Sequence, residues 1–140
     1  MSEENILNGK QLFPFIAPPS GGKGTQTAAL LKAYPEVLGK FDMGATFRAA
    51  VKDSENPLGQ KIRASMDAGQ LVDISIVMQL FVAGLKETAQ NQPEAIGFIL
   101  DGFPRNIEQL DELFKLCEIE GANIARAFYL NVPDQVVVDR

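Results

Sequence analysis

Short apolar runs alternate with longer amphipathic segments along this chain. The apolar runs that fit buried strands cover residues 12–16, 37–42, 97–101 and 127–130. Apolar residues at helical spacing predict helices over residues 25–33, 46–52, 57–68, 75–89 and 107–119, with a further helix beginning at Pro133. Strands that alternate with helices in this way predict an α/β domain with a mainly parallel sheet.

Two segments with candidate chemistry follow predicted strands directly. One covers residues 17–25, after the first strand, and the other is Asp101-Gly102-Phe103-Pro104-Arg105. In open parallel sheets, ligands bind beyond the carboxyl ends of the strands. We therefore expect both segments to contribute to one site at that edge of the sheet.

Residues 17–25 have the composition of a phosphate-binding loop. Glycines let successive backbone N–H groups converge on an anion, and the start of the following helix adds its positive end. Lys23 supplies a full charge for the outer phosphates, and Thr25 supplies a hydroxyl. Ala17 replaces the first glycine of the general phosphate-loop pattern, and Gly24 separates Lys23 from Thr25. Taken alone, the segment also fits a glycine-rich turn with a solvated lysine.

The second segment combines a carboxylate, a glycine and an arginine. Asp101 is placed to orient Mg²⁺ or its waters around a triphosphate. Gly102 permits close approach of the backbone, and Arg105 can bind a phosphate through two hydrogen bonds. The alternative is a turn in which the aspartate caps the next helix. The phosphate loop elsewhere in the chain favours the nucleotide interpretation.

Composition excludes several kinds of chemistry. The chain has 140 residues, no histidine and a single cysteine, Cys117, which lies on an apolar helical stripe. A disulfide framework and histidine-based catalysis are therefore excluded, an ordinary zinc site is not expected because its usual ligands are missing, and Cys117 is expected to be a buried, inert thiol. The length predicts one domain.

Charge and hydropathy limit the partners. The formal net charge of −5 argues against a general binder of nucleic acid or of anionic membranes. The first residues lack the basic and apolar regions of a secretory signal, and no apolar stretch approaches the roughly 20 residues of a membrane helix. We therefore expect a cytoplasmic protein.

Several strings together resemble the adenylate kinase family of nucleoside monophosphate kinases. The strings are Gly22-Lys23-Gly24-Thr25-Gln26, residues 66–72, Asp101-Gly102-Phe103-Pro104-Arg105 with Gln109, and residues 132–140. The resemblance covers residues 12–140, and the string from Asp101 to Arg105 is its most specific part.

The resemblance implies a doubly wound α/β core with a phosphate loop, in one domain over residues 1–140. Residues 43–72 would form a helical AMP-binding insert. The implied reaction is transfer of a phosphoryl group from ATP to AMP, which gives two ADP, with Mg²⁺ accompanying ATP and the protein acting as a monomer. Such a transfer depends on alignment and charge neutralisation, so a site without histidine suffices.

The resemblance also assigns individual residues. The ATP-binding residues would be Ser20, Gly21, Gly22, Lys23, Gly24, Thr25 and Arg140, of which Arg140 stacks on the adenine. The AMP-binding residues would be Met43, Arg48, Met66, Gln70, Leu71, Val72, Gly102, Arg105 and Gln109.

Among these, Arg48 and Arg105 would grip the AMP phosphate, and Gln109 would select adenine over a pyrimidine. Lys23, Arg105 and Asp101 would be the catalytic residues. No side chain would bind Mg²⁺ directly; Asp101 and Thr25 would lie near it, with the nucleotide and waters as its ligands.

The chain also departs from the family pattern. Ala17 and Ser20 replace two glycines of the loop, Met43 replaces a small hydroxyl residue, and Ala45 replaces an aspartate. A UMP- or CMP-type acceptor therefore remains an alternative. The family continues past the position of Arg140 into a lid with more arginines, a last strand and a helix.

We therefore expect a core fragment or a lidless form with weak or no kinase activity, and an exposed strand edge near Phe128. A nucleotide-binding module without turnover and an interaction role on the same scaffold are the other hypotheses.

Overall fold

A parallel sheet forms the centre of the computed structural model, which describes residues 5–18 and 21–135. Its strands are β1 (Gln11–Ile16), β2 (Leu38–Asp42), β3 (Gly97–Asp101), β4 (Asn123–Ile124) and β5 (Phe128–Tyr129). The order across the sheet is β2-β3-β1-β4, and β5 pairs with β1 beyond β4. The described pairings are all parallel, so the α/β prediction is confirmed.

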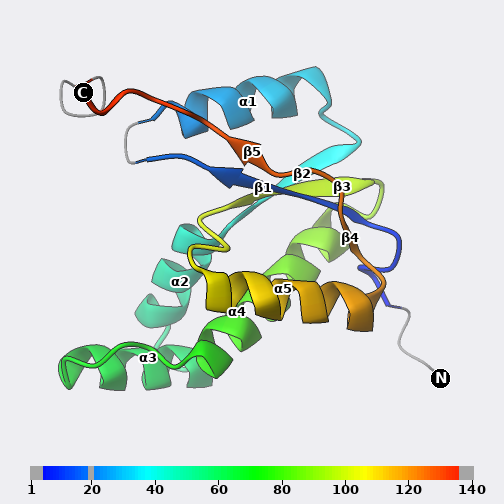
Figure 1. Cartoon of the computed structure of the whole chain (residues 1–140). Coiled ribbons are helices and arrows are strands. Elements are labelled where there is room, and N and C mark those ends of the chain that lie inside the picture. The colour runs from blue at the N-terminus through cyan, green and yellow to red at the C-terminus, as the bar shows by residue number, and fades with distance from the viewer. Residues whose placement is uncertain (1–4, 19–20, 136–140) are drawn as a thin grey trace.

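Helices cover both faces of this sheet, as a doubly wound fold requires. α1 (Lys23–Ala33) lies on one face, and α4 (Ile74–Asn91) and α5 (Ile107–Glu120) lie on the other (Figure 1). α2 (Met43–Lys52) and α3 (Pro57–Asp67) pack together beside α4. Among the described residues, none of the helices combines the length and apolarity that a membrane crossing requires. The helix predicted to begin at Pro133 lies largely outside the described residues.

The boundaries of α3 and α5 follow from side-chain caps. Asn56 accepts hydrogen bonds from the backbone nitrogens of Leu58 and Gly59, and Pro57 occupies the first turn of α3. Asn106 caps α5 in the same way, and Gly121 ends it with a φ of 72°. The cap at Asn106 places the start of α5 directly after the segment Asp101-Gly102-Phe103-Pro104-Arg105.

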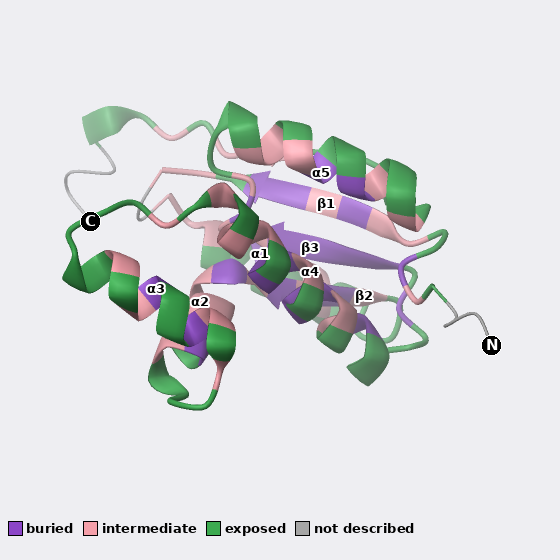
Figure 2. Ribbon diagram, turned by 90° about the horizontal axis from the view of Figure 1, so that it is seen from below, coloured by how far each residue is buried: buried purple, intermediate pink, exposed green. Residues whose placement is uncertain are grey.

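The core lies between the sheet and the helices α4 and α5. β3 is buried along nearly its whole length (Figure 2). Three aromatic rings extend this core toward the site. The ring of Phe81 in α4 stacks on Phe103 with centroids 4.0 Å apart, and meets Phe41 edge-on at 5.2 Å. Phe103 is therefore anchored in the core, although its neighbours Gly102 and Pro104 belong to the site.

A proline in the central strand explains why β4 and β5 are two short strands rather than one. The carbonyls of Leu12 and Ile16 accept hydrogen bonds from Ala125 and Leu130. Pro14 lies at the alternate position between them, so its nitrogen faces the same edge but has no hydrogen to donate. The neighbouring chain leaves the ladder at this point. The strand predicted over residues 127–130 thus appears as the shorter β5, while β4 lies outside every strand that the sequence predicts.

The packing of α3 against α2 generates a test with Gly59→Ala. An added Cβ at Gly59 would collide with the carbonyl oxygen of Ala50. We expect the free energy of unfolding to fall by about 1–3 kcal/mol, because this overpacking opposes the usual gain from alanine in a helix. Urea denaturation followed by circular dichroism measures it.

Gly24→Ala in α1 is the matched control, because a Cβ there has no atom within 4 Å. Its stability should be unchanged or raised. Equal stabilisation of both variants would contradict the close contact between α2 and α3.

Candidate functional site

The turn from β1 into α1 is built on two glycines. Gly22 is the N-cap of α1 and has a φ of 88°, a left-handed conformation that favours glycine. The nitrogen of Gly21 donates to the carbonyl of Pro18 at 3.0 Å, and a Cβ on Gly21 would lie 2.9 Å from that oxygen. Lys23 is consequently the first residue of α1. The predicted contact residue Ser20 lies outside the described residues.

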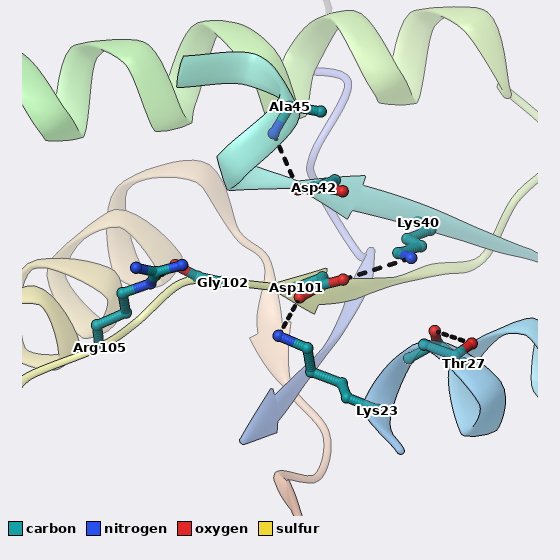
Figure 3. A network of polar contacts seen from close by, with 9 residues as sticks. Lys23, Thr27, Lys40, Asp42, Ala45, Asp101, Gly102 and Arg105 are labelled. Carbon is teal, nitrogen blue, oxygen red and sulfur yellow. Dashed lines mark hydrogen bonds and ion pairs between the residues drawn. The ribbon is translucent and has the colours of Figure 1, made fainter. Parts of the chain in front are cut away.

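Lys23 points to the end of the neighbouring strand β3. Its Nζ lies 2.5 Å from Oδ1 of Asp101, and Nζ of Lys40, from β2, lies 3.3 Å from Oδ2 of the same carboxylate (Figure 3). The side chain of Asp101 is 13% exposed. Burial raises the pKa of Asp101, but the hydrogen bonds and charges of Lys23 and Lys40 outweigh burial and hold the pKa below its usual value. The carboxylate is therefore ionised at neutral pH.

Arg105 is held at the start of α5 by two hydrogen bonds. Its Nε donates to the carbonyl of Gly102 at 2.9 Å, and its backbone nitrogen donates to Oε1 of Gln109 at 2.7 Å. Gly102 has a φ of 82°, which lets the chain turn away from β3. Gln109 thus supports the turn that carries Arg105, a role that the sequence did not indicate.

The guanidinium groups of Arg48 and Arg105 lie beside Gly44 and Gly102, two glycines that are close in space. A Cβ on Gly44, in α2, would lie 3.0 Å from NH1 of Arg48. A Cβ on Gly102 would lie 3.3 Å from NH2 of Arg105 and 3.7 Å from the backbone nitrogen of Gly44. The absence of side chains at these two glycines keeps the space near both arginines open. Two arginines in this arrangement suit a phosphate group.

A cavity of about 1080 Å³ joins the phosphate loop to the second segment. Its lining includes residues 21–25 and also Gly102, Pro104 and Arg105. Lys23 and Arg105 therefore face one shared space. The apolar side of the cavity is formed by Ile107, Leu110, Phe114 and Ile124. Its volume slightly exceeds the roughly 300–1,000 Å³ that is usual for a small-molecule site.

The other predicted AMP contacts lie around α2, α3 and the loop that follows. Met43 begins α2, but its side chain is buried in the core and 7% exposed. Met66 and Leu71 are 55% and 97% exposed, Gln70 is exposed, and Val72 packs against the core. The structure describes all of these residues, and the cavity lining does not include them. Arg140 lies outside the described residues.

Sequence reasoning did not find Lys40 or the role of Asp42. Asp42 caps α2 by accepting a hydrogen bond from the nitrogen of Ala45 at 3.0 Å, and it is the register partner of Asp101. Lys40 lies two positions earlier on β2 and so on the same face of the sheet. Strand alternation places these residues on one face, but only the register places that face beside Asp101.

Comparison with known proteins agrees with this geometry. The family model described as adenylate kinase matches residues 15–140. The adenylate kinase of Synechococcus sp. is 39% identical over 126 residues, which cover 90% of this chain and 61% of that protein. Adenylate kinase 4 of Arabidopsis thaliana is 35% identical over 127 residues, and the adenylate kinase of Trichodesmium erythraeum is 37% identical over 131. The chain matches 48% and 65% of these two relatives.

The ion pairs of Asp101 predict a pH-dependent contribution to stability. Because folding lowers the pKa of Asp101 below its ordinary value of 3.8, this contribution is complete above that value and is lost as the pH falls through the folded-state pKa. The difference in unfolding free energy between the wild type and Asp101→Asn should be constant above about pH 5 and should shrink below about pH 4. Urea denaturation across this range measures it.

Asp111→Asn provides a control, since Asp111 is exposed on α5. Its difference from the wild type should follow a flatter profile at acid pH. An Asp101→Asn difference that grew as the pH fell would contradict the ion pairs.

Proposed function

The chain belongs to the adenylate kinase family, and we propose that it binds ATP and AMP and transfers the terminal phosphoryl group of ATP to AMP, which gives two ADP. One observation carries this proposal: Lys23 of the phosphate loop and Arg105 of the second segment line the same cavity. A donor held by the first and an acceptor held by the second would meet there.

In this proposal, ATP occupies the phosphate-loop side of the cavity. The backbone nitrogens of residues 21–25 and the start of α1 receive its phosphates. Lys23 leaves Asp101 and binds the outer phosphates. Thr25, which is exposed at the start of α1, offers its hydroxyl. The family resemblance adds Ser20 to the loop and Arg140 to the adenine.

AMP would lie on the side of α2 and α5. Arg48 and Arg105, which flank Gly44 and Gly102, would bind its phosphate. Gln109, whose oxygen already accepts from Arg105, would hydrogen-bond the adenine. The largely exposed segment at residues 66–72, together with Met43 at the start of α2, would face the base.

Mg²⁺ fits the polar groups near the phosphate loop. Asp101 offers an ionised, partly exposed carboxylate and Thr25 a hydroxyl, and hard cations prefer such oxygen ligands. These residues would hold the ion through its waters. When bound with ATP, Mg²⁺ would neutralise part of the charge on the phosphates. Among the described residues, no cluster of three or more metal-binding side chains supplies a direct site.

The transfer itself requires little covalent chemistry from this chain. An oxygen of the AMP phosphate forms a bond to the γ-phosphorus of ATP, and the bond from that phosphorus to the bridging oxygen breaks, which leaves ADP. The attacking oxygen is already anionic, so no side chain has to remove a proton. Lys23 and Arg105 would stabilise the charge on the transferring group, and the cavity would align the reactants.

Nucleotide binding without turnover is the second candidate. The chain spans 61% of the Synechococcus relative, and Arg48 and Arg105 are both exposed. Cations that stabilise a transferring phosphoryl group contribute most when water is excluded from them. An assay that couples ADP formation from ATP and AMP to NADH oxidation tests the first candidate, and calorimetry with each nucleotide tests the second.

We also place the protein in the cytoplasm as a monomer. Burial raises the pKa of the Cys117 thiol, so this cysteine is poorly reactive. An inert single thiol fits a reducing compartment.

Lys23→Met tests the ATP site. Loss of the lysine charge should weaken ATP binding by roughly 10- to 100-fold, because a charged hydrogen bond to phosphate is worth about 1.5–3 kcal/mol. Calorimetric titration measures the affinity, and circular dichroism verifies the fold. Lys32→Met, in the last turn of the same helix, is the control and should bind ATP as the wild type does. Unchanged affinity in Lys23→Met would remove Lys23 from the site.

Gln109→Ala tests the acceptor. The variant should lose preference for AMP over UMP and CMP by about 10-fold, because the amide that contacts adenine is gone. Gln109→Glu is the comparison, since it keeps an oxygen for the backbone nitrogen of Arg105 while changing the edge offered to the base. Binding affinities for the three monophosphates provide the measurement. If Gln109→Ala discriminates as the wild type does, Gln109 does not select the base.

A further inference from the structure

Lys40 is a charged residue beside the site, and it has no assigned contact with ATP or AMP. Its Nζ lies 3.3 Å from Oδ2 of Asp101, while Nζ of Lys23 lies 2.5 Å from Oδ1. Each oxygen of this carboxylate therefore faces a different lysine. Lys40 extends from β2 and Lys23 from the start of α1, so the two approach Asp101 from different elements (Figure 3).

The two lysines differ in their access to the cavity. Lys23 lines the cavity, whereas Lys40 is not part of the lining although its side chain is described. A polyphosphate in the cavity would draw Lys23 away from Asp101, because the phosphates carry more negative charge than one carboxylate. Lys40 would keep its contact with Asp101 throughout.

When Lys23 leaves Asp101, the carboxylate would repel the bound phosphates, and Lys40 reduces this repulsion. Asp101 is not part of the lining either, but its Oδ1 lies 2.5 Å from Nζ of Lys23, which is. Without a second cation, Asp101 would be a partly buried carboxylate close to the polyanion, and like charges at short range disfavour binding. Lys40 neutralises Asp101 and holds its Oδ2, so the repulsion is reduced. Mg²⁺ carried by ATP would supply competing positive charge near the same carboxylate, so Lys40 matters most when no divalent cation is present.

We propose that Lys40 is a positioning residue that holds and neutralises Asp101 while Lys23 moves to the phosphates, and that it thereby allows metal-free ATP to bind. This inference rests on the ATP site proposed above.

Calorimetric titration of ATP, once with EDTA and once with saturating Mg²⁺, tests the proposal. Lys40→Gln should weaken metal-free binding by about 5-fold, the scale of a partly exposed ion pair, and Mg²⁺-ATP binding by less than about 2-fold. Lys40→Arg should retain metal-free binding, because it keeps the charge. Lys32→Gln, an exposed lysine of α1, is the control for loss of one positive charge and should change neither value.

A double-mutant cycle with Asp101→Asn tests whether Lys40 acts through Asp101. In the Asp101→Asn background, Lys40→Gln should leave metal-free affinity nearly unchanged. Equal weakening in both backgrounds would mean that Lys40 contacts the phosphates itself, and equal weakening with and without Mg²⁺ would mean a general structural role. Either result overturns the proposal.

The same titrations separate this inference from the proposed function. If the wild type binds ATP and Lys40→Gln binds it equally well with EDTA, the role of Lys40 is overturned and the ATP site stands. If the wild type binds ATP under neither condition, the ATP site is overturned, and the role of Lys40 with it.

Discussion

The parallel register of β1, β2 and β3 is the constraint on which the site depends. Phe15, Asp101 and Asp42 are register partners, so three strands end at one level of the sheet. Everything that follows these strands is thereby brought to one edge: the phosphate loop after β1, α2 after β2 and the arginine-bearing turn after β3. A shift of one residue would turn the side chain of Asp101 to the other face, away from Lys23.

Apolar packing in the core holds the strand ends that carry the site. Phe103 stacks on Phe81, which also meets Phe41 at the end of β2. These rings tie the turns after β2 and β3 to α4. Arg48 in α2 and Arg105 after β3 are exposed, but the backbone that carries them starts from strands anchored in the core. Ligand-binding side chains on a fixed scaffold can reach a ligand without large rearrangement of the chain.

The charge of the site is opposite to that of the chain. The formal net charge is −5, yet Lys23, Lys40, Arg48 and Arg105 gather around the strand ends. Asp101 pairs with two of these cations, Lys23 and Lys40, although it carries only one negative charge. This arrangement keeps mutually repelling lysines close together before an anion arrives, and the resulting local field would favour a compact polyanion over extended nucleic acid.

The sequence alone determined the α/β class, the order of the elements apart from β4, and both strand-end segments, because strand and helix periodicities are local properties. It also indicated Lys23, Asp101 and Arg105, since the spacing of glycines and charges around each is local too. Tertiary structure decided the rest. The separation of β4 from β5 required Pro14 to lie in the centre of the sheet, and the pairing of Lys40 with Asp101 required the register of β2 against β3. Both depend on which strands become neighbours, and neighbours in the sheet are far apart in the chain.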